Sequence, residues 1–138
     1  MGRILAIDYG RKRVGIAVSD PMKMIANGLT TVHPKDLIEF LKDYFNKEKV
    51  DTLVVGYPRK MNNQASEAVN YINPFLKKFK KEFPDIPVQL EDERFTSKMA
   101  QQAMIDGGMK KGERQKKENI DRISATIILQ SYLQHKTI

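Results

Sequence analysis

Carboxylates stand at three places where the hydrophobic pattern of this chain predicts the rim of a core. Asp8 ends an apolar run, the triplet Glu91-Asp92-Glu93 ends another, and Asp121 precedes an apolar helical stripe. Carboxylate oxygens without histidine or cysteine beside them are the ligands that Mg²⁺ and Mn²⁺ prefer. Two such ions about 3.5–4 Å apart would clamp the attacking and leaving oxygens of a phosphodiester. These residue types therefore predict metal-dependent hydrolysis of a phosphodiester.

Asp8 ends a predicted strand and is followed by a tight basic turn around Gly10. An unpaired carboxylate buried here would cost several kcal/mol, so Asp8 is expected to meet water, a cation or both. The alternative is that Asp8 only begins a turn, since Asp and Gly are common turn residues. Arg11, Lys12 and Arg13 lie beside it and are candidates for binding a nucleic-acid backbone.

Asp121 is placed in the first turn of a last helix predicted over residues 119–134. Apolar residues follow it at helical spacing, namely Ala125, Ile128, Leu129 and Tyr132. Asp121 therefore heads the apolar stripe and faces the sheet. An acid in a first helical turn also favours the helix dipole by a few tenths to ~1 kcal/mol, but this does not explain a place on the inner face.

Within the acidic triplet, strand alternation places Glu91 and Glu93 on one face and Asp92 on the other. The pattern does not say which face meets Asp8. Arg94 follows the triplet and could contact a phosphate or pair with one of the acids. Pairing is the commoner role for an arginine.

The elements that must position these acids indicate an α/β domain. Strands are predicted at 3–9, 13–19, 28–33, 50–55 and 86–91, and helices after Pro34, at 64–83 (containing Pro74), at 96–105 and at 119–134. Ligand sites in open α/β sheets gather at the carboxyl ends of parallel strands. We therefore expect the loops after Val55 and Glu91 to lie at the same end of the sheet as Asp8.

The charge of the chain favours a polyanionic partner. It has 24 Lys and Arg against 17 Asp and Glu, a formal net charge of +7, which favours nucleic acid first and an anionic membrane second. One basic cluster consists of Lys110, Lys111, Arg114, Lys116 and Lys117, in a glycine-containing segment (106–118) predicted to be a mobile loop. A second consists of Lys77, Lys78, Lys80 and Lys81.

Composition excludes several classes of protein. A chain of 138 residues is the usual size of one domain, here 1–138. With no cysteine and only two histidines, His33 and His135, disulfides and thiolate catalysis are excluded and a catalytic triad is disfavoured. The sequence has neither an apolar run long enough to span a membrane nor a secretory signal, so a cytoplasmic protein without membrane partners is expected.

Four motifs together resemble the YqgF family of ribonuclease H-like proteins. They are Ile7-Asp8-Tyr9-Gly10 with residues 12–20, Val54-Val55-Gly56-Tyr57-Pro58, Asp92-Glu93-Arg94-Phe95-Thr96-Ser97, and Asp121-Arg122-Ile123-Ser124-Ala125 with residues 128–133. The motifs occur in the order of the family and cover nearly the whole chain, so the match is specific. The family is described as Holliday junction resolvases and as nucleases that mature the end of pre-16S ribosomal RNA.

The resemblance implies a ribonuclease H-like fold, a five-stranded mixed sheet whose first three strands are antiparallel, with helices packed on it. It implies that Asp8, Glu93 and Asp121 are the catalytic acids and that they bind Mg²⁺ or Mn²⁺. The resemblance thus selects Glu93 rather than Glu91 or Asp92. The chain departs from the family after Pro58, where Lys60-Met61-Asn62-Asn63 replaces an asparagine-methionine-aspartate-glycine run. A fourth carboxylate from that loop is therefore absent.

These observations favour a metal-dependent nuclease that acts on structured nucleic acid and processes precursor ribosomal RNA, as a monomer or homodimer. Resolution of branched DNA at a Holliday junction is the alternative nuclease function. A non-catalytic nucleic-acid-binding assembly module is a different class, disfavoured because all three acids are present. Asp8-Tyr9-Gly10 with Gly15 also resembles the phosphate hairpin of actin-like ATPases, but 138 residues leave no room for their second lobe.

Overall fold

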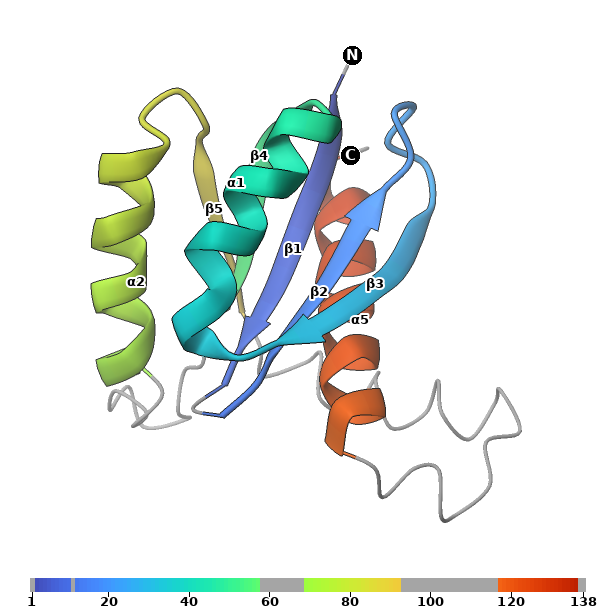
Figure 1. Ribbon diagram of the computed structural model, residues 1–138. Coiled ribbons are helices and arrows are strands. Elements are labelled where there is room, and N and C mark those ends of the chain that lie inside the picture. The colour runs from blue at the N-terminus through green and yellow to red at the C-terminus, as the bar shows by residue number, and fades with distance from the viewer. Residues whose placement is uncertain (1, 11, 58–68, 93–116, 137–138) are drawn as a thin grey trace.

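The computed structural model describes residues 2–10, 12–57, 69–92 and 117–136 (Figure 1). Its elements in chain order are β1 (Arg3–Tyr9), β2 (Val14–Ser19), β3 (Ala26–Val32), the 3₁₀ turn η1 (Pro34–Asp36), α1 (Leu37–Lys47), β4 (Val50–Tyr57), α2 (Val69–Glu82), β5 (Val88–Asp92) and α5 (Lys117–Lys136). The helix predicted at 96–105 lies outside the described residues. None of the helices in the described ranges is long and apolar enough to cross a membrane.

The strands form one five-stranded sheet in the order β3-β2-β1-β4-β5. The β1–β2 and β2–β3 pairs are antiparallel, whereas β1–β4 and β4–β5 are parallel. This confirms the predicted mixed sheet with three antiparallel strands first. Because β1, β4 and β5 run the same way, their carboxyl ends lie together, and we call this end of the sheet the carboxyl edge.

The two faces of the sheet carry separate cores, as Figure 1 shows with α1 and α2 on one side and α5 on the other. The α1/α2 face buries Leu5, Ile7, Ile16, Leu53 and Val55 of the sheet against Leu37, Leu41, Ile72, Phe75 and Phe79 of the helices. The α5 face buries Ile4, Ala6, Ala17 and Val54 against Ala125, Ile128, Leu129 and Leu133. The stripe predicted on the last helix is confirmed, and Tyr132 packs against the same cluster.

The third strand lies two residues earlier than predicted at its start and ends one residue earlier. Pairing of Ser19 with Ala26 and of Val18 with Asn27 extends β3 toward the hairpin, although alanine and asparagine have low strand propensity. His33, predicted as the end of the strand, instead caps η1, because its Nδ1 accepts a hydrogen bond from the Lys35 amide at 3.1 Å.

Other elements also differ from the prediction. The strand predicted from residue 86 begins at Val88, after Pro87, which has no amide hydrogen and uses its carbonyl to accept from the Leu53 amide at 3.0 Å. The last helix begins at Lys117, so residues 117 and 118 are not part of a loop. Neither glycine nor proline interrupts the chain there, and the helix gains a half-turn. The α2 helix continues through Pro74.

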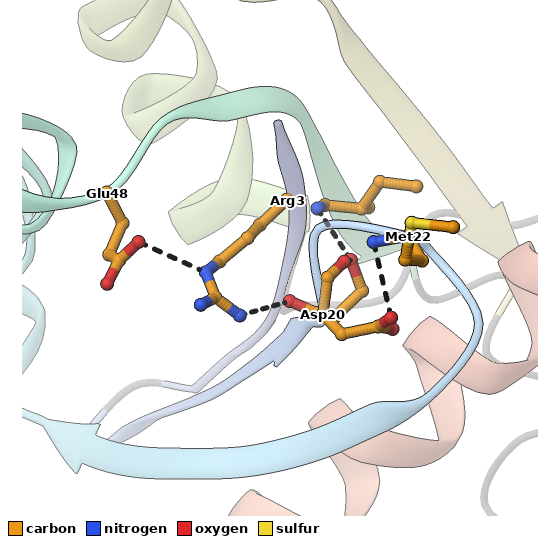
Figure 2. Close-up of polar contacts among 6 residues, drawn as sticks. Arg3, Asp20, Met22 and Glu48 are labelled. Carbon is orange, nitrogen blue, oxygen red and sulfur yellow. Dashed lines mark hydrogen bonds and ion pairs between the residues drawn. The ribbon is translucent and has the colours of Figure 1, made fainter. Parts of the chain in front are cut away.

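Polar contacts close the end of the sheet opposite the carboxyl edge (Figure 2). The Arg3 guanidinium contacts a Glu48 carboxylate oxygen at 3.3 Å and donates to the Ser19 carbonyl at 3.0 Å. The exposed Asp20 carboxylate accepts from three backbone amides of the β2–β3 hairpin, including Met22 at 3.2 Å and Ile25 at 2.8 Å. These hydrogen bonds, those of Ile25 and Met24 foremost, lower the pKa of Asp20.

Candidate active site

Asp8 is the penultimate residue of β1 and lies on the α5 face at the carboxyl edge. Alternation along the strand places it on the same face as Ile4 and Ala6, both of which pack against α5. Its side chain is half-buried. Asp8 therefore lies where the aliphatic core of the α5 face gives way to solvent, as the sequence predicted for a carboxylate at a core rim.

Glycines flank Asp8 on both neighbouring strands. Gly15 of β2 is its direct partner in the antiparallel pairing. On the other side, the pairing of Ile7 with Val55 leaves Gly56 of β4 level with Asp8. Neither glycine has a side chain, so neither adjacent strand places a side chain level with Asp8. This arrangement depends on strand register and was not recognised in the sequence, which gave the two glycines only as parts of motifs.

A second carboxylate lies in the same row of the sheet. Glu91 of β5 pairs with Gly56 and is 8% exposed. Its Oε1 accepts a hydrogen bond from Ser131 Oγ of α5 at 2.8 Å, so its side chain is on the α5 face, as Asp8 is. The backbones of Asp8 and Glu91 are two strand spacings apart, about 9.5 Å. The sequence left open which side chains of the acidic triplet share a face with Asp8. In the structure, the Glu91 side chain does.

The other two predicted acids are described less fully. Asp121 is the fifth residue of α5, in the amino-terminal part of the helix that lies toward the carboxyl edge (Figure 1). Its placement in the first turn was wrong, because the helix begins at Lys117. The helix dipole acts mainly within the first turn. It therefore explains an acid in the second turn less well than one in the first turn, where Asp121 was predicted. The side chain of Asp121, and Glu93 and Arg94 altogether, lie outside the described residues.

The turn that follows Asp8 requires glycine at residue 10. The Gly10 amide donates to the Arg13 carbonyl at 2.9 Å, and a Cβ built on Gly10 would lie 2.5 Å from that same oxygen. The tight turn presents Lys12 to solvent and leaves Arg13 half-buried. Arg11, Lys110, Lys111, Arg114 and Lys116 lie outside the described residues, as does the side chain of Lys117.

Two tyrosines tie the start of α2 to the carboxyl edge and were not singled out from the sequence. Tyr57, the last residue of β4, donates its hydroxyl to Asn73 Oδ1 at 3.0 Å. The Tyr9 ring lies 5.2 Å from that of Phe75, centroid to centroid, and burial raises the pKa of the Tyr9 hydroxyl. Phe75 of α2 was not singled out from the sequence either, although it lies one turn from both Ile72 and Phe79.

The donor chemistry at this edge fits a hard divalent cation. Asp8 offers carboxylate oxygens at a half-exposed position without neighbouring side chains on the adjacent strands, and the chain has no cysteine that would favour a softer metal. Within the part of the chain that the structure describes, no group of three or more potential ligands comes together. A complete set therefore requires acids outside that part.

A family model described as "RuvX: Holliday junction resolvase" matches residues 2–135 of the chain. The chain belongs to this family. A relative from Phocaeicola vulgatus is 57% identical over 136 residues, covering 99% of this chain and 98% of the relative. One from Christiangramia forsetii is 57% identical over 133 residues, covering 96% and 98%. Both relatives are named "Putative pre-16S rRNA nuclease". These matches confirm the resemblance stated from the motifs.

Solved structures confirm the ribonuclease H-like fold. Thermus thermophilus RuvC in complex with a Holliday junction substrate superposes with a TM-score of 0.62 at 14% identity, covering 99% of this chain and 98% of RuvC. The yeast mitochondrial Holliday junction resolvase Ydc2 gives a TM-score of 0.54 at 16% identity, covering 97% and 81%. At these identities the likeness concerns the arrangement of the elements.

Proposed function

We propose that the chain is a metal-dependent nuclease that hydrolyses phosphodiester bonds in structured nucleic acid, with precursor 16S ribosomal RNA as its substrate. The observation that carries the proposal is the half-buried Asp8 at the carboxyl edge, between Gly15 and Gly56, in a chain that matches the family over its whole length. The names of the full-length relatives support the choice of substrate.

We assign Asp8, Glu93 and Asp121 as the ligands of Mg²⁺ or Mn²⁺. When bound, the cations would polarise the scissile phosphate and stabilise the charge that develops on its oxygens. Asp8 is held by a strand that is paired on both sides, so its carboxylate is positioned before the substrate arrives. The alternation predicted from the sequence puts Glu93 on the same face as Glu91, whose side chain bonds to α5, and this favours Glu93 as the second ligand.

Basic residues around this edge would hold the substrate through its phosphates. Lys12 and Arg13 are in the turn directly after β1. Arg11, Arg94 and the basic residues Lys110, Lys111, Arg114, Lys116 and Lys117 would extend this surface. Contacts of this kind position a nucleic acid without reading its bases. They also make its affinity fall steeply as salt rises.

Resolution of Holliday junctions is the second candidate function. The description of the family favours it, as does the fold shared with a resolvase that was solved on its junction. Symmetric resolution requires two active sites, and hence a homodimer, whereas a monomer suffices to process RNA. The two candidates therefore differ in both substrate and assembly.

The deciding experiment compares the wild type with Asp8→Asn on precursor ribosomal RNA and on four-way junction DNA, in parallel, with Mn²⁺. We expect Asp8→Asn to reduce cleavage of the RNA by more than the roughly 10–100-fold that loss of a residue behind a metal ligand costs. Asp43→Asn is the matched control, because Asp43 is exposed on α1. Thermal melts show whether both variants are folded.

Each outcome has a distinct meaning. Cleavage that survives both Asp8→Asn and chelation of the metal would contradict the proposed chemistry. Cleavage of the junction alone, lost in Asp8→Asn, would favour the resolvase. Binding that is unaffected by Asp8→Asn, without cleavage under any divalent metal, would identify a non-catalytic module.

A further inference from the structure

The solvent side of α2 carries a concentration of positive charge that the candidate site does not use. Its buried side consists of Ile72, Phe75 and Phe79. Its opposite side presents four exposed lysines, Lys77, Lys78, Lys80 and Lys81. Their spacing places all four on one side of the helix, away from the core.

These lysines are not neutralised within the described part of the chain. The sequence of α2 holds one acid, Glu82, and its carboxylate pairs with Lys42 of α1 at 3.3 Å. None of the four lysines forms an ion pair with a described carboxylate. The neighbouring α1 is different, because Glu39 and Asp43 balance its lysines.

The lysine face is connected to the carboxyl edge. The α2 helix returns the chain between the parallel strands β4 and β5, so it begins at the carboxyl edge and runs away from it (Figure 1). The hydrogen bond from Tyr57 to Asn73 holds its first turns there. At 1.5 Å per residue, Lys77 and Lys81 lie about 12–18 Å along the axis from Val69.

We infer that the exposed face of α2 is a second phosphate-binding surface, along which the nucleic acid extends away from the scissile bond. Lysines in a row without acids are suited to the backbone of a polyanion and carry no preference for sequence. The lysines lie on the face of the sheet opposite to the Asp8 side chain, so the nucleic acid must pass around the carboxyl edge to reach them. A B-form duplex advances about 3.4 Å per base pair, so 12–18 Å beyond the edge corresponds to a flank of at least about four to five base pairs.

The choice of RNA as the ligand rests on the proposed nuclease function. The binding surface itself is tested by measuring affinity, independently of cleavage. The probes are two RNA duplexes of one sequence, the first carrying a flank of about ten base pairs beyond the cleavage site and the second a flank of about two. Affinity is measured by fluorescence anisotropy over a series of salt concentrations, and cleavage is followed with Mn²⁺ on the same samples.

The test variant is Lys77→Gln with Lys81→Gln. The matched control is Lys47→Gln with Lys49→Gln, which removes the same charge from exposed positions at the end of α1 and just after it, on the amino-terminal side of β4. For the long duplex we expect the test variant to bind about 5–10-fold more weakly at ~0.1 M salt and to lower the salt slope by about 1.5–2. The short duplex should be bound and cleaved as by the wild type.

Three results would overturn the inference. In the first, the test and control variants weaken binding equally, so that only net charge matters. In the second, the long and short duplexes lose affinity equally. In the third, the test variant loses binding to anionic phosphatidylserine vesicles while RNA binding is unchanged, so that the face serves a membrane. If no protein cleaves either duplex but the length-dependent loss persists, the proposed function fails while the binding surface stands.

Discussion

The core between the sheet and α1 and α2 combines aliphatic side chains with a cluster of aromatic rings, whereas the core under α5 is aliphatic and contains three buried alanines. On the first, Phe83 packs against Phe45 and Phe79, each at 4.9 Å between ring centroids. On the second, Ala6 and Ala17 of the sheet meet Ala125 of α5. Large rings bury the most apolar area, whereas small residues let a helix approach a sheet closely.

This difference indicates that the aromatic packing on one face contributes mainly to stability, whereas the residues of the candidate site lie on the other face. None of the described members of the α1/α2 core is charged. The core under α5 leads along β1 directly to Asp8 and, across Gly56, to Glu91. Substitutions on the two faces should therefore separate loss of folding from loss of cleavage.

The largest expected effect on stability comes from the aromatic face. Phe79 is fully buried, and Phe79→Ala should lower the free energy of unfolding by about 3–5 kcal/mol, since it removes a large side chain and leaves a cavity. Urea denaturation measures this loss. Per folded molecule, RNA cleavage should stay at the wild-type rate. A rate that falls as far as in Asp8→Asn, in samples that are still folded, would break the comparison.

A smaller and different effect is expected from Ser131 on the α5 face. Ser131→Ala removes one hydrogen bond to the nearly buried Glu91 and should cost about 1–2 kcal/mol of unfolding free energy. It also loosens the attachment of β5 to α5, next to the proposed ligands. The Mn²⁺ concentration for half-maximal cleavage should therefore rise, by less than the 10–100-fold typical of residues bonded to a ligand.

Gln130→Ala is the control for Ser131→Ala, because it removes a polar side chain at an exposed position of α5. If both variants shift the metal dependence equally, the hydrogen bond to Glu91 has no special part in the site.

The smallest effect is expected at the opposite end of the sheet. Backbone hydrogen bonds lower the pKa of Asp20, so the ionised carboxylate stabilises the hairpin above its unfolded pKa, and this contribution is lost as pH falls through the lowered value. Wild type and Asp20→Asn should thus differ slightly in melting temperature near pH 5 and converge near pH 2. If the difference in melting temperature grew as the pH fell, the ionised Asp20 carboxylate would not be the stabilising form. Cleavage at neutral pH should be the same for both.

The parts that the sequence predicted well are those decided by local pattern. The apolar runs of β1 and β2 placed Asp8 correctly at the end of a strand, and the spacing after Asp121 identified the inner face of α5. The antiparallel pairing of β1 with β2 was indicated by the tight turn around Gly10, whereas that of β3 followed from the resemblance of the motifs.

The parts that the sequence missed depend on partners far along the chain. The start of β3 is set by its pairing with β2, and the capping role of His33 follows from where that pairing stops. The positions of Gly15 and Gly56 on either side of Asp8 require the register of three strands. The bond between Ser131 and Glu91 joins residues 40 apart in sequence. Local propensity contains none of this information.

The central position of β1 has a consequence for the persistence of the site. Edge elements of a fold open by local fluctuations, whereas a strand paired on both sides separates only when the whole unit unfolds. β1 lies between β2 and β4, with β3 and β5 outside them. Fraying of β3 or β5 therefore leaves the Asp8 backbone held between β2 and β4.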